Sequence, residues 1–239
     1  MEVTEAILLK AAPYNESQSI LTLFSKQEGY ISMITQAKSS KRRVLYPVMQ
    51  SCEVEFLRNE RGGLHKLINL SPVDRASTLH FDIERSNYAQ LWGNFLATLL
   101  RCQEKDESLY EYVESAVALL EESQEQYLNI TLLFFVRLAC FMGVKPNTDD
   151  YVKGMLLNVE TGEFVAPEKR GSNMVFSGPN VAEAIYCLSV LSVEKAKGLR
   201  IGFKSFEIIL KTIMSMYEHI FAVRFDRGGI EIILQVLDK

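Results

Sequence analysis

Cysteine and histidine are scarce in this chain of 239 residues, which holds four cysteines and three histidines. The cysteines lie 38 to 50 residues apart, each within an apolar segment, and no two of them form a CxxC pair. This spacing argues against a zinc module and against a disulfide framework, so we expect no bound metal and no cofactor. We expect small buried thiols in a reducing cytosol instead. The cysteines are Cys52, Cys102, Cys140 and Cys187.

Catalytic motifs are missing as well. His65, His80 and His219 lie in no HExxH motif or other metal-binding spacing, and the chain contains no GxSxG sequence. Residues 198–205 come nearest to a phosphate-binding loop, but they are one residue short between the glycines. Phe203 also stands where the lysine should directly follow glycine. We therefore interpret this segment as a loop leading into a helix, and we expect that the protein is not an enzyme.

Long hydrophobic runs and a strong excess of charge are also lacking. The most apolar segment, residues 132–144, is shorter than the ~20 residues of a membrane span and contains Arg137. No secretory signal is visible at the N-terminus, and we expect no membrane partner. The net charge is −4, but residues 1–80 hold 10 basic and 8 acidic side chains. This mildly basic N-terminal third is where an anionic partner is expected to bind.

Short segments typical of β-strands fill the region from Thr4 to Ser71, separated by turn residues such as Pro13 and Gly29. Five short strands with no long helix among them suit a small barrel of the size of an OB-fold. A sandwich half or an SH3-like barrel would give a similar pattern. The predicted strands are Glu5–Ala11, Ser17–Ser25, Tyr30–Gln36, Cys52–Arg58 and Leu64–Leu70.

From Ile83 onward apolar residues recur at intervals of three and four, which predicts amphipathic helices packed as a bundle. Trp92 lies on the first of these apolar stripes, so we interpret it as a packing residue. Residues 155–166 predict a small hairpin with Gly162 at its turn. The predicted helices cover residues 88–99, 109–120, 128–142, 181–191 and 206–221.

The predicted fold class is therefore α+β, with an N-terminal five-stranded OB-fold barrel followed by an α-helical bundle domain with a small β-hairpin insertion. We place the OB-fold in residues 1–80 and the helical domain in residues 81–239. The hairpin and its loop form an insertion at residues 146–179.

Four cations fall within six residues in the run Lys38-Ser39-Ser40-Lys41-Arg42-Arg43, between the third and fourth predicted strands. Such a run can place ammonium and guanidinium groups on consecutive phosphates, while the nearby rings of Tyr30 and Tyr46 stack bases. A solvated loop that keeps the protein soluble is the alternative, and composition does not decide between them. The candidate DNA-binding residues are Lys38, Lys41, Arg42 and Arg43, with Lys10, Arg58, Arg61 and Lys66 on the same predicted barrel.

Two other groups of cations lie in the helical part. Arg137 is the only charge in a very apolar helix, and we favour an ion pair or an extension to the surface over a role in function. The functional alternative is a cation at the edge of an apolar groove, suited to a peptide that ends in an aromatic residue and a carboxylate. For the later group we favour a solvated helix boundary over a second binding contact. That group is Lys195, Lys197, Arg200 and Lys204.

The first seventy residues resemble the opening of the RecO family of bacterial recombination mediators. The family's first strand, its Tyr-x-Glu turn, its Leu-Thr-x-Phe strand and its Gly-x-Ile strand occur here in the same order and spacing. The step from Ala37 to Lys38 is similar to the family's basic loop, and Arg137 to Gly143 resembles its central helix. The matching segments are Ala6 to Lys10, Tyr14 to Ser17, Ile20 to Ser25 and Gly29 to Ile31.

This resemblance implies binding to single- and double-stranded DNA, strand annealing, and cooperation with RecR to load RecA onto DNA coated by SSB. It also implies a docking site for the acidic, Phe-ending tail of SSB, for which Arg137 becomes a candidate. The implied place of action is the bacterial cytoplasm, on the nucleoid during repair.

One departure from the family concerns zinc. Many members carry two CxxC pairs after the central helix, whereas this chain has no cysteine between Pro146 and Pro179, so we expect the hairpin to replace a zinc module. Because the net charge is acidic, the protein alone is expected to bind DNA weakly, and RecR is expected to supply part of the affinity. The alternative function is a non-catalytic adaptor of OB-fold and helices that binds only proteins.

Overall fold

The computed structural model describes residues 1–35, 46–73, 79–144, 146–171 and 174–238. By contacts the chain divides into two compact units. The first combines Met1–Glu122 with Gly228–Leu237, and the second is formed by Ser123–Arg227. Among the described residues, no helix has both the length and the apolar character needed to cross a bilayer.

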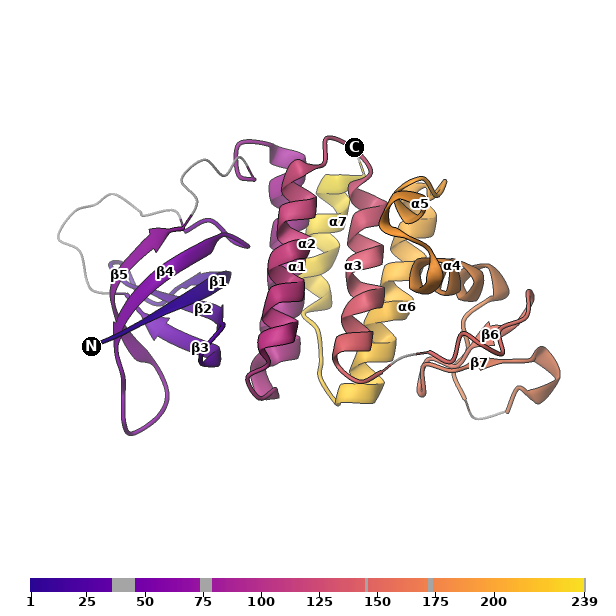
Figure 1. The fold of residues 1–239 in the computed structure, drawn as a ribbon, viewed down its shortest axis with the longest axis horizontal. Coiled ribbons are helices and arrows are strands. Elements are labelled where there is room, and N and C mark those ends of the chain that lie inside the picture. Colours follow the sequence, from indigo (N-terminus) through magenta and orange to yellow (C-terminus); the bar gives the residue numbers. More distant parts are fainter. Residues whose placement is uncertain (36–45, 74–78, 145, 172–173, 239) are drawn as a thin grey trace. The chain divides into compact units, whose positions relative to one another are not determined.

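The first unit begins with five strands that close into a barrel in the order β1-β2-β3-β5-β4 (Figure 1). β1 pairs antiparallel with both β2 and β4, and β3 pairs parallel with β5 at Met33↔His65 and Ile34↔Lys66. A closed five-stranded barrel of this kind is the OB-fold, and the predicted fold class is confirmed. The strands are β1 (Glu2–Pro13), β2 (Ser19–Ser25), β3 (Gly29–Ile34), β4 (Ser51–Leu57) and β5 (His65–Pro72).

Alternation of apolar and polar side chains produces the barrel core. In β4, Val54 and Phe56 are buried while Glu53 points to solvent, because successive side chains of a strand face opposite ways. A bulge between Leu8 and Lys10 shifts the register of β1. The buried core consists of Ala6, Leu8, Leu21, Leu23, Ile31, Met33, Cys52, Val54, Phe56 and Leu67.

Helices of the first unit pack against the barrel. Asp82 caps the first helix by accepting a hydrogen bond from the backbone N–H of Arg85 at 2.8 Å. This helix lies against β1, and the ring of Tyr110 in the second helix lies 5.6 Å from that of Phe24. The helices are α1 (Ile83–Leu99), the short 3-10 helix η1 (Leu100–Cys102), α2 (Glu107–Glu122) and α7 (Arg227–Leu237), most of which belongs to this unit. The sequence patterns did not predict α7.

The second unit is built around α3, which is buried on most sides and contacts α4, α5 and α6. The hydroxyl of Tyr217 in α6 donates to the carbonyl of Phe135 in α3 at 2.9 Å. The predicted hairpin is confirmed, and Gly162 at its turn has φ of 75°. The elements are α3 (Tyr127–Phe141), β6 (Leu156–Leu157), β7 (Phe164–Val165), the 3-10 helix η2 (Pro167–Lys169), α4 (Pro179–Val190), α5 (Val193–Lys197) and α6 (Phe203–Phe221).

Aromatic contacts hold the hairpin insertion on α4. The ring of Tyr151 stacks on that of Tyr186 at 4.1 Å between centroids and an angle of 17°. It also meets the edge of Phe164 at 4.9 Å. A small apolar core of three rings therefore stands at the base of the insertion.

The prediction that the cysteines are buried is wrong for part of the set. Cys52 lies in the barrel core, but Cys102 and Cys140 are exposed and Cys187 is half-buried. Cys102 ends η1 and Cys140 lies in the last turn of α3, where apolar neighbours in sequence do not guarantee cover. All four are described, and none forms a disulfide. The interpretation of Trp92 as a packing residue is confirmed, since its side chain is fully buried.

Candidate nucleic-acid interface

The turn between β1 and β2 is locked by the side chain of Asn15. Its Oδ1 accepts hydrogen bonds from the backbone N–H groups of Ser17 and Gln18, at 2.9 and 2.8 Å. The backbone N–H of Tyr14 donates to the carbonyl of Gln18 at 2.9 Å. The side chain of Gln18 in turn donates to the carbonyl of Thr35, just beyond β3, at 3.0 Å. These bonds fix the turn to the adjacent end of β3.

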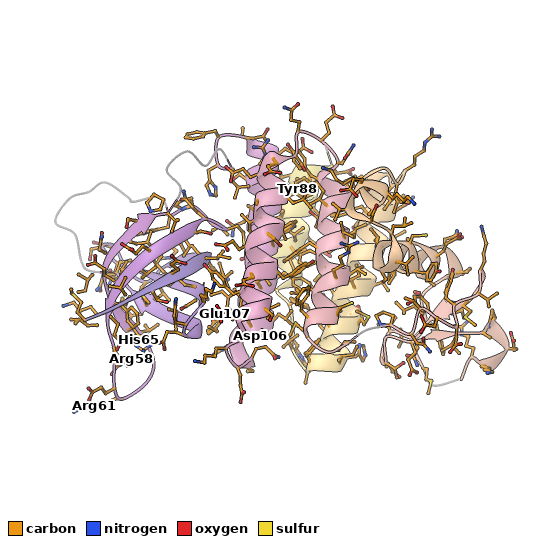
Figure 2. The ribbon with its side chains drawn as sticks, viewed as in Figure 1. Arg58, Arg61, His65, Tyr88, Asp106 and Glu107 are labelled. Atoms are coloured by element: carbon orange, nitrogen blue, oxygen red, sulfur yellow. The ribbon has the colours of Figure 1, made fainter. Side chains whose placement is uncertain are left out.

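The loop between β4 and β5 is ordered in a similar way by Asn59. Its Nδ2 donates to the carbonyl of Gly62 at 2.7 Å, and its Oδ1 accepts from the backbone N–H of Arg61 at 3.2 Å. Gly62 and Gly63 have φ of 80° and 87°, a left-handed conformation that glycine adopts without strain. Figure 2 shows Arg61 at the far end of this loop, with its side chain directed away from the barrel. The loop therefore presents one exposed guanidinium on a preformed turn.

Three predicted cations of the barrel are exposed and available. Lys10 projects from β1 and Lys66 from β5, and Arg61 stands on the β4–β5 loop. Among the described residues, no carboxylate lies within ion-pairing distance of any of the three. They can contact phosphates without first breaking an ion pair.

Arg58 is held differently, because two carboxylates bind its guanidinium. Nε donates to Oε1 of Glu2 at 2.7 Å, Nη2 pairs with the other oxygen of Glu2, and Nη2 also lies 2.9 Å from Glu28. The hydrogen bond from Arg58 lowers the pKa of Glu2. Arg58 thus ties the first residues of β1 and the β2–β3 turn to the end of β4, and a phosphate would have to compete for it.

Lys26, on the same β2–β3 turn, is also committed to carboxylates. Its Nζ lies 3.1 Å from both Glu107 and Glu111, at the start of α2. These two hydrogen bonds raise the pKa of Lys26. The turn is fastened to α2 on one side and to Arg58 on the other.

The predicted basic run falls within residues 36–45, outside the described residues. It comprises Lys38, Lys41, Arg42 and Arg43. On its C-terminal side, Tyr46 packs against the barrel core, and burial raises the pKa of its phenol. Tyr30 in β3 is half-buried.

Carboxylates gather on the outer face of β1 and β4. Glu5 lies directly opposite Glu53 in the register of the two strands, and Glu55 lies opposite Val3. Directly opposed residues of an antiparallel pair share a face, so these side chains form an acidic surface. This face repels phosphate and fits a cationic partner better.

Arg137 in α3 donates from Nη2 to the carbonyl of Leu191 at 2.5 Å and is half-buried. The pKa of Glu194 is lowered, mainly by hydrogen bonds to the backbone and to Ser192. The positive charges of Lys197 and Arg137 lower it further. Arg137 thus fixes the chain after α4. Of the later group of cations, Lys195 and Lys197 lie on α5, Arg200 lies between the helices and Lys204 lies at the start of α6.

The insertion offers no set of zinc ligands. Residues 146–179 contain neither cysteine nor histidine, and structural zinc sites use those donors. In the part of the chain that the structure describes, no three His, Cys, Asp or Glu side chains come close enough to hold a metal ion.

Sequence reasoning did not single out Tyr14 as a candidate, although it stands on the β1–β2 turn and is 59% exposed. In the sequence it is one residue of a predicted turn and of the Tyr-x-Glu segment, and neither pattern indicates its exposure. The Asn15-Glu16-Ser17 segment that follows was the available signal, because asparagine side chains close such turns.

Comparison with known proteins identifies both parts of the chain. The family model described as Recombination protein O N terminal matches residues 1–76, and the one described as Recombination protein O C terminal matches residues 80–218. The DNA repair protein RecO of Phocaeicola vulgatus is 25% identical over 198 residues, covering 81% of each chain. The DNA repair protein RecO of Porphyromonas gingivalis is 30% identical over 152 residues, covering 61% of this chain and 62% of its own.

Proposed function

Because the chain belongs to the RecO family of DNA repair proteins, we propose that it is a non-catalytic, DNA-binding recombination mediator. It binds single- and double-stranded DNA, anneals strands and, with RecR, helps to load RecA onto SSB-coated DNA. It acts in the bacterial cytoplasm, on the nucleoid during repair. The observation that carries the proposal is the closed OB-fold barrel with exposed, unpaired cations on its strands and loops.

The proposed mechanism is charge neutralisation. Lys38, Lys41, Arg42 and Arg43 hold phosphates together with Lys10, Arg61 and Lys66. Arg58 contributes least, since the Glu2 and Glu28 carboxylates already satisfy its guanidinium. With three or four phosphate contacts, a plot of the logarithm of the binding constant for single strands against the logarithm of the salt concentration is expected to have a slope of roughly −2 to −3.

The test is a titration of a fluorescein-labelled single-stranded oligonucleotide at low salt, followed by anisotropy. The wild-type protein is expected to bind saturably, and a K41E/R42E/R43E variant to lose binding while its circular dichroism stays unchanged. A matched variant, K195E/K197E/R200E, makes the same change in net charge on α5 and the loop after it. Unchanged affinity in the first variant, or an equal loss in both, contradicts the proposed basic site.

A protein-only adaptor is the second candidate, favoured by the acidic face of β1 and β4. Glu5, Glu53 and Glu55 suit a cationic protein surface better than DNA. In that case the wild-type protein shows no saturable binding of single or duplex oligonucleotides at low salt, whereas a stable protein complex is recovered with RecR.

For the SSB tail we propose Arg137 as the cation that contacts the peptide carboxylate. Only one of its five N–H donors is used by Leu191, so the guanidinium retains donors for a ligand. An R137Q variant is expected to lose affinity for an acidic peptide ending in phenylalanine while its helix content is kept. Equal peptide affinity in wild type and R137Q rules out this role.

A further inference from the structure

The outer faces of the barrel differ in charge, and this difference selects a path for a nucleic-acid strand. The β1–β4 face carries Glu5, Glu53 and Glu55. On the β2–β3 face the opposed pairs are Ile20↔Ile34 and Thr22↔Ser32, which carry no charge. Thr22 is buried, whereas Ile20, Ser32 and Ile34 are half-buried. A phosphate chain is repelled by the first face and meets no carboxylate on these pairs.

The two ends of the β2–β3 face differ in how far they are covered. Towards the β2–β3 turn, Phe24 packs against Tyr110 of α2. Towards the other end, Lys10 lies opposite Thr22 in the β1–β2 register and is exposed. Because directly opposed residues point to the same side of a sheet, the ammonium of Lys10 borders the uncharged pairs. Cation and neutral surface therefore meet next to the β1–β2 turn.

Tyr14 stands on that turn. Its backbone N–H donates to the carbonyl of Gln18, and Asn15 and Gln18 lock the turn and join it to Thr35. Tyr14 itself is 59% exposed. Because the backbone of the turn is already fixed, stacking on Tyr14 orders only its side chain and costs no loop-ordering entropy. In OB-folds, the β1–β2 loop and the face of strands 2 and 3 are where oligonucleotides bind.

We propose that Tyr14 stacks on an unpaired base of a single DNA strand that passes the half-buried residues Ile20, Ser32 and Ile34 of the β2–β3 face, with Lys10 on a neighbouring phosphate. This rests on the proposed DNA-binding function and adds to it a means of distinguishing single strands from duplex. In a duplex the faces of the bases are covered by their neighbours, so the ring finds no partner there.

The experiment measures Kd for a labelled single strand and for a duplex of equal length with Tyr14→Ala and Tyr14→Phe. Loss of one stacked base is expected to weaken single-strand binding by roughly 5- to 150-fold in Tyr14→Ala. Tyr14→Phe keeps the ring and is expected to stay within about twofold of wild type, because each base stacks on the ring face. Duplex affinity and the salt slope are expected to stay unchanged, because no phosphate contact is removed.

Phe81, which is 86% exposed and precedes α1, supplies the matched control. Phe81→Ala removes an exposed ring away from the barrel strands and is expected to bind single strands as the wild type does. The inference is overturned if Tyr14→Ala binds single strands normally, if it loses single-strand and duplex affinity equally, or if Phe81→Ala loses as much. If the wild-type protein binds no DNA, the proposed function itself fails, and that result is separate from any effect of Tyr14.

Discussion

Gly93 marks the closest approach of α1 to the barrel, and we expect that adding one methyl group there destabilises the first unit. A Cβ at this position would lie 2.3 Å from the carbonyl oxygen of Leu9 and 2.4 Å from Cγ1 of Val48. Real Cβ atoms keep at least about 3.0 Å from such neighbours, so α1 must move by about 0.7 Å or more. The Leu9 oxygen belongs to the main chain of β1 and cannot turn aside.

Two effects of opposite sign decide the magnitude for Gly93→Ala. Alanine favours a helix interior over glycine by about 1 kcal/mol. Overpacking a dense core costs about 1–3 kcal/mol, and here the clash is with main chain. Leu91, Trp92 and Phe95 around it are fully buried, so the helix has no free space to move into. A clash with main chain in such a site falls in the upper part of the overpacking range, about 2–3 kcal/mol, so we expect a net loss of about 1–2 kcal/mol in the free energy of unfolding.

The assay is urea unfolding followed by the fluorescence of Trp92, which is the single tryptophan and directly precedes Gly93. With a slope near 2 kcal/mol per molar, the expected loss lowers the urea midpoint by roughly 0.5–1 M. Ala97→Gly, one turn further along α1, isolates the helix-propensity effect and is expected to cost about 1 kcal/mol. A midpoint for Gly93→Ala equal to or above that of wild type would refute the argument, since propensity would then outweigh the contact.

Three more predictions concern reactivity, pH and the insertion. Burial raises the pKa of the Cys52 thiol to about 12. At pH 8 an alkylating reagent is therefore expected to label the exposed Cys102 far sooner than Cys52, which mass spectrometry of timed samples measures. Equal labelling rates would show that the barrel opens freely. The hydrogen bond from Arg58 lowers the pKa of Glu2, so its stabilisation is complete above the ordinary carboxyl pKa of 4.5 and disappears as pH falls through the lowered value. Arg58→Gln is therefore expected to flatten the pH dependence of Tm in acid, and a curve parallel to wild type would contradict this. Tyr151→Ala removes the ring stacked on Tyr186 and is expected to speed tryptic cleavage within residues 146–179, whereas an unchanged digestion pattern would mean that other contacts hold the insertion.

The strands were predictable because local patterns fix them. Val54 and Phe56 alternate with Glu53 in β4. Gly29, whose φ is 73°, starts β3 directly after a turn. The predicted second strand began two residues early, at Ser17, because Asn15 draws Ser17 and Gln18 into the turn. Patterns of two to four residues carry this information, so barrel and bundle could be read from the sequence.

The environment of single residues could not be read in the same way. Arg58 looked like one more barrel cation, but closure of the barrel brings it to Glu2, 56 positions away in sequence. Tyr14 is exposed on a turn that the side chain of Asn15 closes, and the sequence does not show this exposure. Helix α7 was missed although Ile230, Ile233, Leu234 and Leu237 follow the helical i, i+3, i+4, i+7 spacing. Gly228 and Gly229 directly before this stripe disfavour a helix start, and they hid the signal.

The grouping of Gly228–Leu237 with Met1–Glu122 has a consequence for synthesis on the ribosome. The first unit begins the chain, but its last segment emerges only after residues 123–227 have been translated. Until then Ile230 and Leu234, which are buried in the finished protein, cannot cover the apolar surface they pack against, and such exposed apolar surface favours aggregation. A fragment that stops at Glu122 would keep this unfinished condition permanently.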